Sequence, residues 1–268
     1  IDFELLPGSQ RENLVLFMEE LSDAFHSEME NPIITMATPA VDWSDAWDYY
    51  ALAQITDGLF IMGYNYFYSG SETAGPVSPL GGYYYDLDFT INDYITKTEG
   101  QLNKIILGLP YYGYDWPVVD SLIHSDTIGY GDAIIYENAD PMAQLYGSQW
   151  DEDSHSAWFS YQTNLWQQSW YDDSLSLSTK YQYAIDNELS GIGIWALGYD
   201  DGHQELWGAI YDKFTSSQVV GDINQDDAVN ILDVIALVNI ILGYEEQIDL
   251  ADLNGDSIIN IIDIIELI

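Results

Sequence analysis

Short apolar runs alternate with amphipathic stretches along most of the chain. Apolar runs bounded by polar residues are typical of strands buried on both faces, and a 3.6-residue apolar period is typical of helices that cover them. We expect strands at residues 33–37, 59–62, 104–109 and 192–197, and helices at 11–28, 45–54, 177–188 and 203–214. This alternation predicts an α/β fold with parallel strands and the strand-to-helix spacing of a (β/α) barrel.

One long segment departs from this period. Residues 117–173 are rich in Tyr, Trp, Ser and Asp and are too many for a loop, so we interpret them as an inserted subdomain. Residues 215–219 form a short linker before a C-terminal module. The pattern therefore predicts a first domain at 1–214, which contains the insertion, and a second domain at 220–268.

Charge and composition limit the classes of partner. The 268 residues are 47% hydrophobic, enough for one large core and a small second one. Five Lys and Arg against 45 Asp and Glu give a formal charge of -40, which repels nucleic acid and anionic membranes. A solvated acidic surface explains the excess equally well. No apolar run approaches membrane-spanning length, and the lack of Cys leaves the redox compartment open.

Oxygen-bearing side chains repeat in the second domain, in two twelve-residue stretches at 222–233 and 252–263. In both, Asp or Asn occupies positions 1, 3, 5, 9 and 12, which are ligand positions of an EF-hand-like calcium loop, and the position-7 carbonyl adds a ligand. The expected ligands are Asp222, Asn224, Asp226, Ala228, Asn230, Asp233, Asp252, Asn254, Asp256, Ile258, Asn260 and Asp263. We therefore predict two structural Ca²⁺ sites, and two acidic turns that match by chance are the alternative.

The two loops depart from the regular EF-hand. Position 6, where Gly permits a sharp bend, is Asp227 or Ser257, and position 12 is Asp instead of the bidentate Glu. An apolar helix is expected after each loop, at 231–242 and 261–268.

Paired loop-helix repeats of this kind resemble type I dockerin modules, with "GDINQDDAVNILDVIALVNIILG" and "ADLNGDSIINIIDIIELI" as the two halves. The resemblance implies a small all-α calcium-binding domain that binds a cohesin-bearing scaffold protein, and hence an extracellular or cell-surface location. Loop positions 10 and 11 are Ile231-Leu232 and Ile261-Ile262, apolar where familiar cellulosomal dockerins are often polar.

Two carboxylates open the chain. In "IDFELLPGS", Asp2 and Glu4 alternate with Ile1 and Phe3, so both carboxylates point to one side of a strand. Active residues of a (β/α) barrel lie where its strands end. Neighbouring carboxylates repel when both are ionised, so one tends to hold a proton, as a general acid must. A solvated strand edge is the plainer interpretation.

The segment "IDFE" is similar to the tail of the DxxDxDxE signature of glycoside hydrolase family 18, the chitinase family. The segments "IMGYNYFYSGSETAGPVSPL", "KIILGLPYYGYDWP" and "GIGIWALGYDDG" follow in that family's order and resemble its sixth, seventh and eighth strands. The insertion resembles the small domain that many members carry between strands seven and eight. The resemblance implies a partial (β/α)8 TIM barrel, from the end of strand 4 to helix 8, with a small α+β insertion.

The same resemblance implies roles for individual residues. Glu4 would donate a proton to the glycosidic oxygen, and Asp2 would orient the substrate's acetamide, which attacks the anomeric carbon with retention of configuration. Tyr64 would donate a hydrogen bond to that acetamide. The implied substrate-binding residues are Met62, Asn65, Tyr112 and Trp195, with Trp195 stacking beneath the reacting sugar and Asn65 standing where the family often has Asp. Taken singly, the aromatic residues could be ordinary core side chains, and catalysis of this kind needs no cofactor.

We thus expect a glycoside hydrolase that cleaves β-1,4-linked N-acetylglucosamine, in chitin or chito-oligosaccharides. A peptidoglycan-directed N-acetylglucosaminidase and a non-catalytic carbohydrate-binding or scaffold-assembly protein are the alternatives. Because the chain begins at Ile1, close to an expected strand end, we also expect a fragment whose barrel lacks its first four strands. Such a barrel would expose strand edges and could be inactive by itself.

Overall fold

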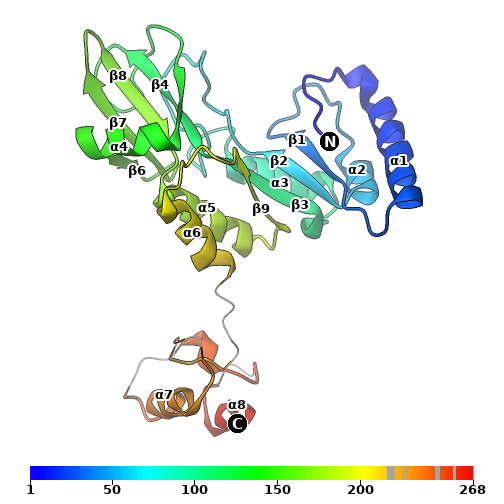
Figure 1. The fold of residues 1–268 in the computed structure, drawn as a ribbon, viewed down its shortest axis with the longest axis vertical. Coiled ribbons are helices and arrows are strands. Elements are labelled where there is room, and N and C mark those ends of the chain that lie inside the picture. Colours follow the sequence, from blue (N-terminus) through cyan, green and yellow to red (C-terminus); the bar gives the residue numbers. More distant parts are fainter. Residues whose placement is uncertain (216–220, 225, 227, 245–247, 256–257, 268) are drawn as a thin grey trace. The chain divides into compact units, whose positions relative to one another are not determined.

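Four parallel strands form the main sheet of the computed structural model (Figure 1). Their order is β1 (Thr35–Pro39), β2 (Gly58–Met62), β3 (Ile105–Pro110) and β9 (Gly191–Trp195). The structure describes residues 1–215, 221–224, 226, 228–244, 248–255 and 258–267. The chain divides into two units, Ile1–Ile210 and Tyr211–Ile268. The expected α/β class is confirmed, and the observed strands lie within about two residues of those expected.

The N-terminal segment extends this sheet beyond β1. The backbone nitrogen of Ile1 donates to the carbonyl of Thr35 at 2.8 Å, and the nitrogen of Ala37 donates to the carbonyl of Ile1 at 2.7 Å. This is the pattern of a parallel pair. The first residues therefore lie beside β1, which agrees with the strand end expected there.

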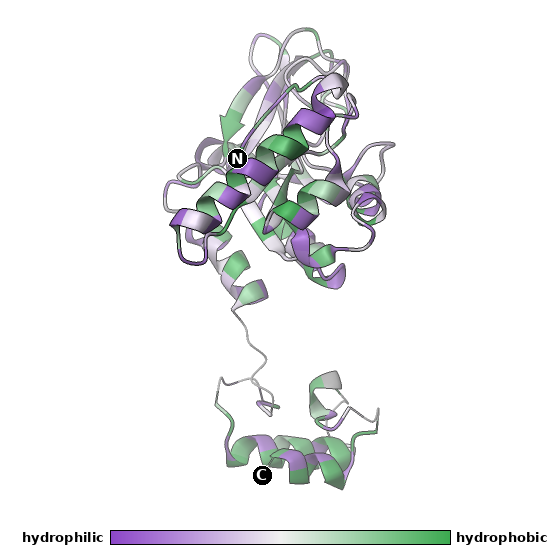
Figure 2. Ribbon diagram, turned by 90° about the vertical axis from the view of Figure 1, so that its right-hand side faces the viewer, coloured by the Kyte–Doolittle hydropathy of each residue, from purple (hydrophilic) through white to green (hydrophobic). Residues whose placement is uncertain are grey.

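Helices follow the strands and cover the sheet. They are α1 (Arg11–Glu28), α2 (Tyr49–Ile55), α3 (Leu87–Lys97), α5 (Ser174–Asp186) and α6 (Gln204–Phe214), with short 3-10 turns at Gly8–Gln10 and Leu102–Lys104. Polar and apolar residues interleave along α1, whose buried positions are Leu14 and Met18 (Figure 2). The side chains of Asp48, Asp86 and Asp173 accept backbone N–H bonds at the starts of α2, α3 and α5.

Two helices differ from expectation. The predicted start of the second helix at residue 45 is wrong, because the Asp42 carboxylate accepts bonds from Ser44, Ala46 and Trp47 nitrogens and holds this stretch as a loop. Helix α3 was not expected at all. Its buried face includes Thr90, whose hydroxyl donates to the carbonyl of Ala40, and a polar residue on that face weakens the apolar period.

The insertion is an antiparallel sheet with one helix. Its strand order is β5 (Asp132–Ile135), β4 (Tyr112–Val118), β8 (Trp166–Tyr171), β7 (Ser156–Gln162) and β6 (Gln149–Asp151), and α4 (Tyr136–Tyr146) packs beside it. Trp116, Trp158 and Trp170 are buried in its core, the last two with ring centroids 5.6 Å apart. The insertion thus begins near residue 112, earlier than the expected 117, because β4 follows β3 directly.

The second unit contains helices α7 (Ile231–Ile241) and α8 (Ile261–Leu267) and a 3-10 turn at Asp249–Ala251. Ile223, Leu237, Ile240 and Ala251 form its buried core. Both helices follow the expected loops, and α7 ends one residue before the expected boundary at 242. Within the described residues, helices long and apolar enough to span a bilayer are absent.

Candidate active site

One cavity of about 490 Å³ opens at the carboxyl ends of β1, β2 and β9. Parallel strands finish at the same edge, so Pro39, Met62 and Trp195 come together there although they are distant in sequence. The cavity is lined by all seven residues proposed from the sequence, namely Asp2, Glu4, Met62, Tyr64, Asn65, Tyr112 and Trp195. Their catalytic and binding roles stay predictions.

Tyr64 faces both N-terminal carboxylates. Burial, together with the nearby charges of Asp2 and Glu4, raises the pKa of Tyr64 to about 12. A phenol with this pKa keeps its proton at neutral pH and can donate a hydrogen bond to a ligand in the cavity. Asp2 and Glu4 are themselves exposed, so their carboxylates are reachable from solvent.

Asn65 is held by Tyr112, the first residue of β4. The Tyr112 hydroxyl donates to the Asn65 Oδ1 atom at 2.7 Å, and burial raises the pKa of Tyr112, so it remains a donor. The backbone of Asn65 has a φ of 63°, in the left-handed region that Asn tolerates better than most residues. Because the Asn65 Oδ1 atom accepts the bond from Tyr112, the Nδ2 amide group of Asn65 points away from the Tyr112 hydroxyl.

Aromatic side chains form the walls of the cavity. Trp195, at the end of β9, is 50% exposed, which leaves a ring face open to solvent. On the loop after β1, Trp43 meets Tyr85 edge to face with ring centroids 4.8 Å apart, and Tyr68 completes the lining. Exposed aromatic rings suit stacking against sugar rings. Three of these lining residues, Trp43, Tyr68 and Tyr85, were not predicted from the sequence, although each lies in the segment after a predicted strand.

In the first of the two expected calcium loops, backbone N–H groups hold several of the expected ligand oxygens in place. The backbone nitrogen of Asp226 donates to Asp222 Oδ1 at 3.1 Å and to Asn224 Oδ1 at 3.0 Å, which draws these oxygens together. The two oxygens of buried Asp233 accept bonds from the nitrogens of Asn224 and Asn230, at 3.1 and 2.7 Å, and tie the start of the loop to its end. This set of hard oxygens fits Ca²⁺.

The second loop repeats the contacts of Asp233 at Asp263, whose two oxygens accept bonds from the nitrogens of Asn254 and Asn260 at 3.3 and 2.7 Å. The Asn260 Nδ2 donates to the carbonyl of Ile258 at 2.9 Å, as Asn230 does to Ala228 at 2.8 Å. Hydrogen bonds from the nitrogens of Asn260, Asn254 and Leu253 lower the pKa of Asp263. Asp256, the expected position-5 ligand, lies outside the described residues.

Comparisons with known proteins identify a family for each of the two predicted domains. The family model described as glycosyl hydrolases family 18 matches residues 1–200, and the dockerin type I domain model matches residues 220–268. The sporulation-specific glycosylase YdhD of Bacillus subtilis is 30% identical over 208 residues, covering 74% of this chain and 46% of its own length. Human di-N-acetylchitobiase is 28% identical over 206 residues, covering 68% of this chain and 52% of its own. The chain therefore spans about half the length of these curated relatives.

Solved structures give the same result for the fold. The crystal structure of the Bacillus subtilis glycosylase YdhD is 28% identical, with a TM-score of 0.60 over 72% of this chain and 63% of that one. A family 18 chitinase from Cycas revoluta, solved with (GlcNAc)3, is 22% identical, with a TM-score of 0.72 over 79% of this chain and 66% of that one. The second likeness speaks for the fold alone.

Proposed function

The chain belongs to glycosyl hydrolase family 18 and carries a type I dockerin domain, and on this premise we propose that it cleaves β-1,4-linked N-acetylglucosamine in chitin or chito-oligosaccharides. The observation that carries the proposal is the single cavity that contains Asp2, Glu4, Tyr64 and Trp195. Two carboxylates, a protonated phenol and an open indole face are what hydrolysis assisted by the substrate's acetamide requires. The main sheet and residues 1–4 would then be the later part of a (β/α)8 barrel, from the end of strand 4 to helix 8.

In this mechanism Glu4 donates its proton to the glycosidic oxygen as the bond to the anomeric carbon breaks. The acetamide oxygen of the same sugar attacks that carbon and forms an oxazolinium ion. Asp2 orients the acetamide through its N–H, and the Tyr64 hydroxyl donates to its oxygen. Water then opens the ring, with Glu4 as base, and the product retains its configuration. Met62, Asn65, Tyr112 and Trp195 bind the sugar.

The dockerin would attach this activity to a cohesin-bearing scaffold protein. Dockerin type I domains bind calcium, and the two oxygen-lined loops are proposed as two structural Ca²⁺ sites. Attachment of this kind implies an extracellular or cell-surface location. The formal charge of -40 disfavours nucleic acid and anionic lipid as partners.

The test is hydrolysis of chitotetraose by the full chain in calcium buffer, with products separated by chromatography and the anomer assigned by NMR. We expect β-anomeric products, and Glu4→Gln should lower the rate by at least about 10²-fold. Glu12→Gln is the matched control, since Glu12 is an exposed carboxylate on α1. Binding of the oligomer without turnover would instead indicate a non-catalytic sugar-binding protein, and equal rates for the wild type and Glu4→Gln would remove Glu4 from the mechanism.

A further inference from the structure

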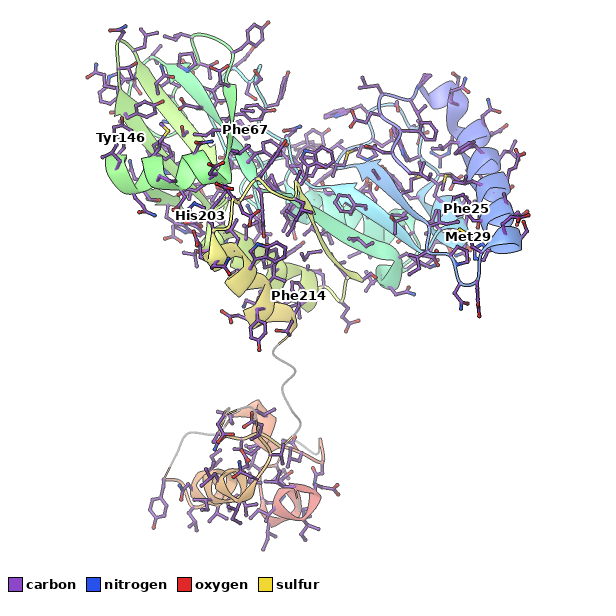
Figure 3. The ribbon with its side chains drawn as sticks, viewed as in Figure 1. Phe25, Met29, Phe67, Tyr146, His203 and Phe214 are labelled. Atoms are coloured by element: carbon purple, nitrogen blue, oxygen red, sulfur yellow. The ribbon has the colours of Figure 1, made fainter. Side chains whose placement is uncertain are left out.

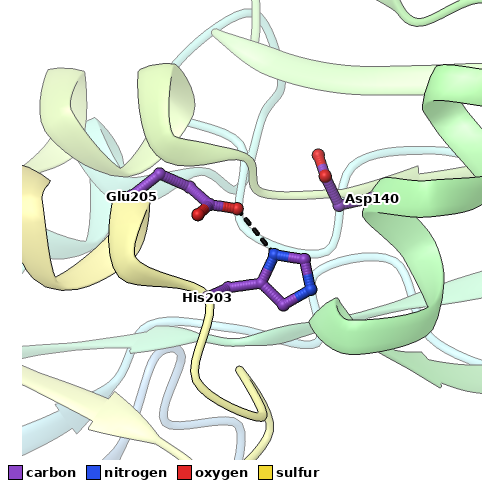
Figure 4. A group of neighbouring side chains, drawn as sticks. All are labelled: Asp140, His203 and Glu205. Atoms are coloured by element: carbon purple, nitrogen blue, oxygen red, sulfur yellow. Dashed lines mark hydrogen bonds and ion pairs between the residues drawn. The ribbon is translucent and has the colours of Figure 1, made fainter.

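A histidine and two carboxylates meet between the insertion and the last helix of the first unit (Figure 4). Asp140 comes from α4, His203 from the residue before α6, and Glu205 from the first turn of α6. One ligand atom from each side chain lies within 4.8 Å of the other two. None of the three lines the active-site cavity. We propose that these three residues bind a divalent transition-metal ion of the Zn²⁺ class.

Neighbouring side chains hold the three donors in place. The Tyr136 hydroxyl donates to Glu205 Oε1 at 3.1 Å, and its ring meets that of His203 edge to face, with centroids 5.3 Å apart. Gln144 Nε2 donates to Asp140 Oδ2 at 2.6 Å. Ligands whose remaining atoms are hydrogen-bonded in this way are typical of metal sites, because the outer contacts fix ligand orientation.

The electrostatics of the cluster also favour a cation. The carboxylates of Asp140, Asp200 and Glu205 surround His203, and Glu205 Oε1 lies 2.7 Å from its Nδ1 atom. The side-chain partners found for Asp140 and Glu205 in the described part of the chain are Gln144, Tyr136, Tyr171 and His203, and none of these carries a fixed positive charge. A bound dication would neutralise both carboxylates.

The donor set selects the type of ion. An imidazole nitrogen suits Zn²⁺ and its neighbours in the first transition row, whereas Ca²⁺ and Mg²⁺ prefer oxygen alone. Tetrahedral Zn²⁺, with bonds of about 2.0–2.1 Å, needs donors about 3.4 Å apart. His203 Nδ1 and Glu205 Oε1 are 2.7 Å apart in a direct hydrogen bond that the ion would replace, so Glu205 must turn slightly away from the imidazole. All three ligand atoms lie within 4.8 Å of one another, so small side-chain rotations would place them around one ion. Asp140 and His203 are half-buried and Glu205 is exposed, so an ion can enter from solvent.

Such an ion would fasten the insertion to the sheet domain. His203 lies close to the base of the insertion, next to the start of α6 (Figure 3). The ion would join α4 to the start of α6 through ligands that are more than sixty residues apart in sequence. Without an ion, a protonated His203 would instead bind these carboxylates, so protons compete with the ion for this site.

The experiment is calorimetric titration of the full chain with Zn²⁺ after saturation with Ca²⁺, so that the dockerin loops are filled. We expect one Zn²⁺ per chain, and at least 10-fold weaker binding in each of His203→Gln, Asp140→Asn and Glu205→Gln. His26→Gln is the control, since His26 is an exposed histidine on α1. Co²⁺ in place of Zn²⁺ should give visible absorption bands that His203→Gln abolishes.

A second measurement, thermal melting, tests the proposal even if the variants fail to fold. Wild-type protein should melt at a higher temperature with Zn²⁺ than without it, at constant Ca²⁺, and the His26→Gln variant should do the same. Absence of stoichiometric Zn²⁺ binding by the wild type would overturn the proposal. Binding by a folded His203→Gln variant with wild-type affinity would overturn it equally.

Discussion

The Tyr112 hydroxyl donates a 2.7 Å hydrogen bond to Asn65 Oδ1, which joins the start of β4 to the segment after β2 inside the cavity. Residue 65 is a neutral amide, whereas the resemblance to family 18 leads us to expect a carboxylate there. On that expectation, the cavity contains one negative charge fewer next to Tyr64. We expect the pH dependence of catalysis to reflect this missing negative charge.

Replacing Asn65 by Asp should move the pH profile of oligosaccharide cleavage. A new carboxylate favours the protonated form of acidic groups around it, so the alkaline limb of kcat/KM should shift to higher pH. Tyr112→Phe is the control, because it removes the hydrogen bond without adding charge and should cost about 1 kcal/mol of stability. An unchanged alkaline limb in Asn65→Asp would show that this residue lies outside the reacting environment.

Tyr64 should affect stability at high pH. Its pKa is raised to about 12 in the folded chain, from an ordinary value of about 10, so the unfolded state loses the proton first. The stabilisation is complete below pH 10 and is lost as pH rises from about 10 to 12. Tyr64→Phe should therefore flatten the decline in unfolding free energy across this window, measured by urea denaturation at a series of pH values. A decline as steep as in the wild type would contradict the assignment.

Removal of calcium should unfold the second unit and spare the first. The carboxylates of the first loop would repel one another without a cation, and bound Ca²⁺ at a hundred times its Kd contributes about 2.7 kcal/mol per site. Calorimetry with and without chelator should show that only the transition of residues 211–268 moves. Asp233→Ala should mimic the chelator for the first loop, since its two oxygens tie that loop together. Identical melting curves in both conditions would refute the calcium sites.

A buried ion pair should be a strong determinant of stability. Lys180 Nζ donates to Asp172 Oδ1 with both side chains almost fully buried, and burial raises the pKa of Asp172 and lowers that of Lys180. Lys180→Met leaves an uncompensated buried carboxylate and should cost about 3–5 kcal/mol in urea unfolding. Lys97→Met is the matched control, because Lys97 pairs with Asp93 at the surface and should change stability by less than about 1 kcal/mol. Similar losses in the two variants would show that burial does not set the cost.

Much of the fold could be predicted because its signals are local. The ends of α1 match the predicted helix, Arg11–Glu28. The seven cavity residues came from short segments that resemble motifs of family 18, and most of these segments follow parallel strands whose ends meet at one edge of the sheet. Helix α3 escaped prediction because Thr90, on its buried face, interrupts the apolar pattern.

Contacts between distant segments gave no such signal. The Trp43–Tyr85 pair requires knowing that the loop after β1 approaches the loop before α3. Asp140, His203 and Glu205 have no metal-binding spacing in the sequence, because α4 and α6 bring them together only in the folded chain. Tertiary packing, rather than residue type, decides these clusters.

The backbone nitrogen of Tyr111 donates to the carbonyl of Trp195 at 2.7 Å, one residue before the insertion begins. The residue before the insertion is therefore bonded through its main chain to a residue that lines the cavity. A side-chain substitution at either position would not remove this contact. Over evolutionary time, insertions and deletions should accumulate at the far turns of the β4–β8 sheet. The length of the chain between Pro110 and Gly113 should stay constant among descendants of this protein.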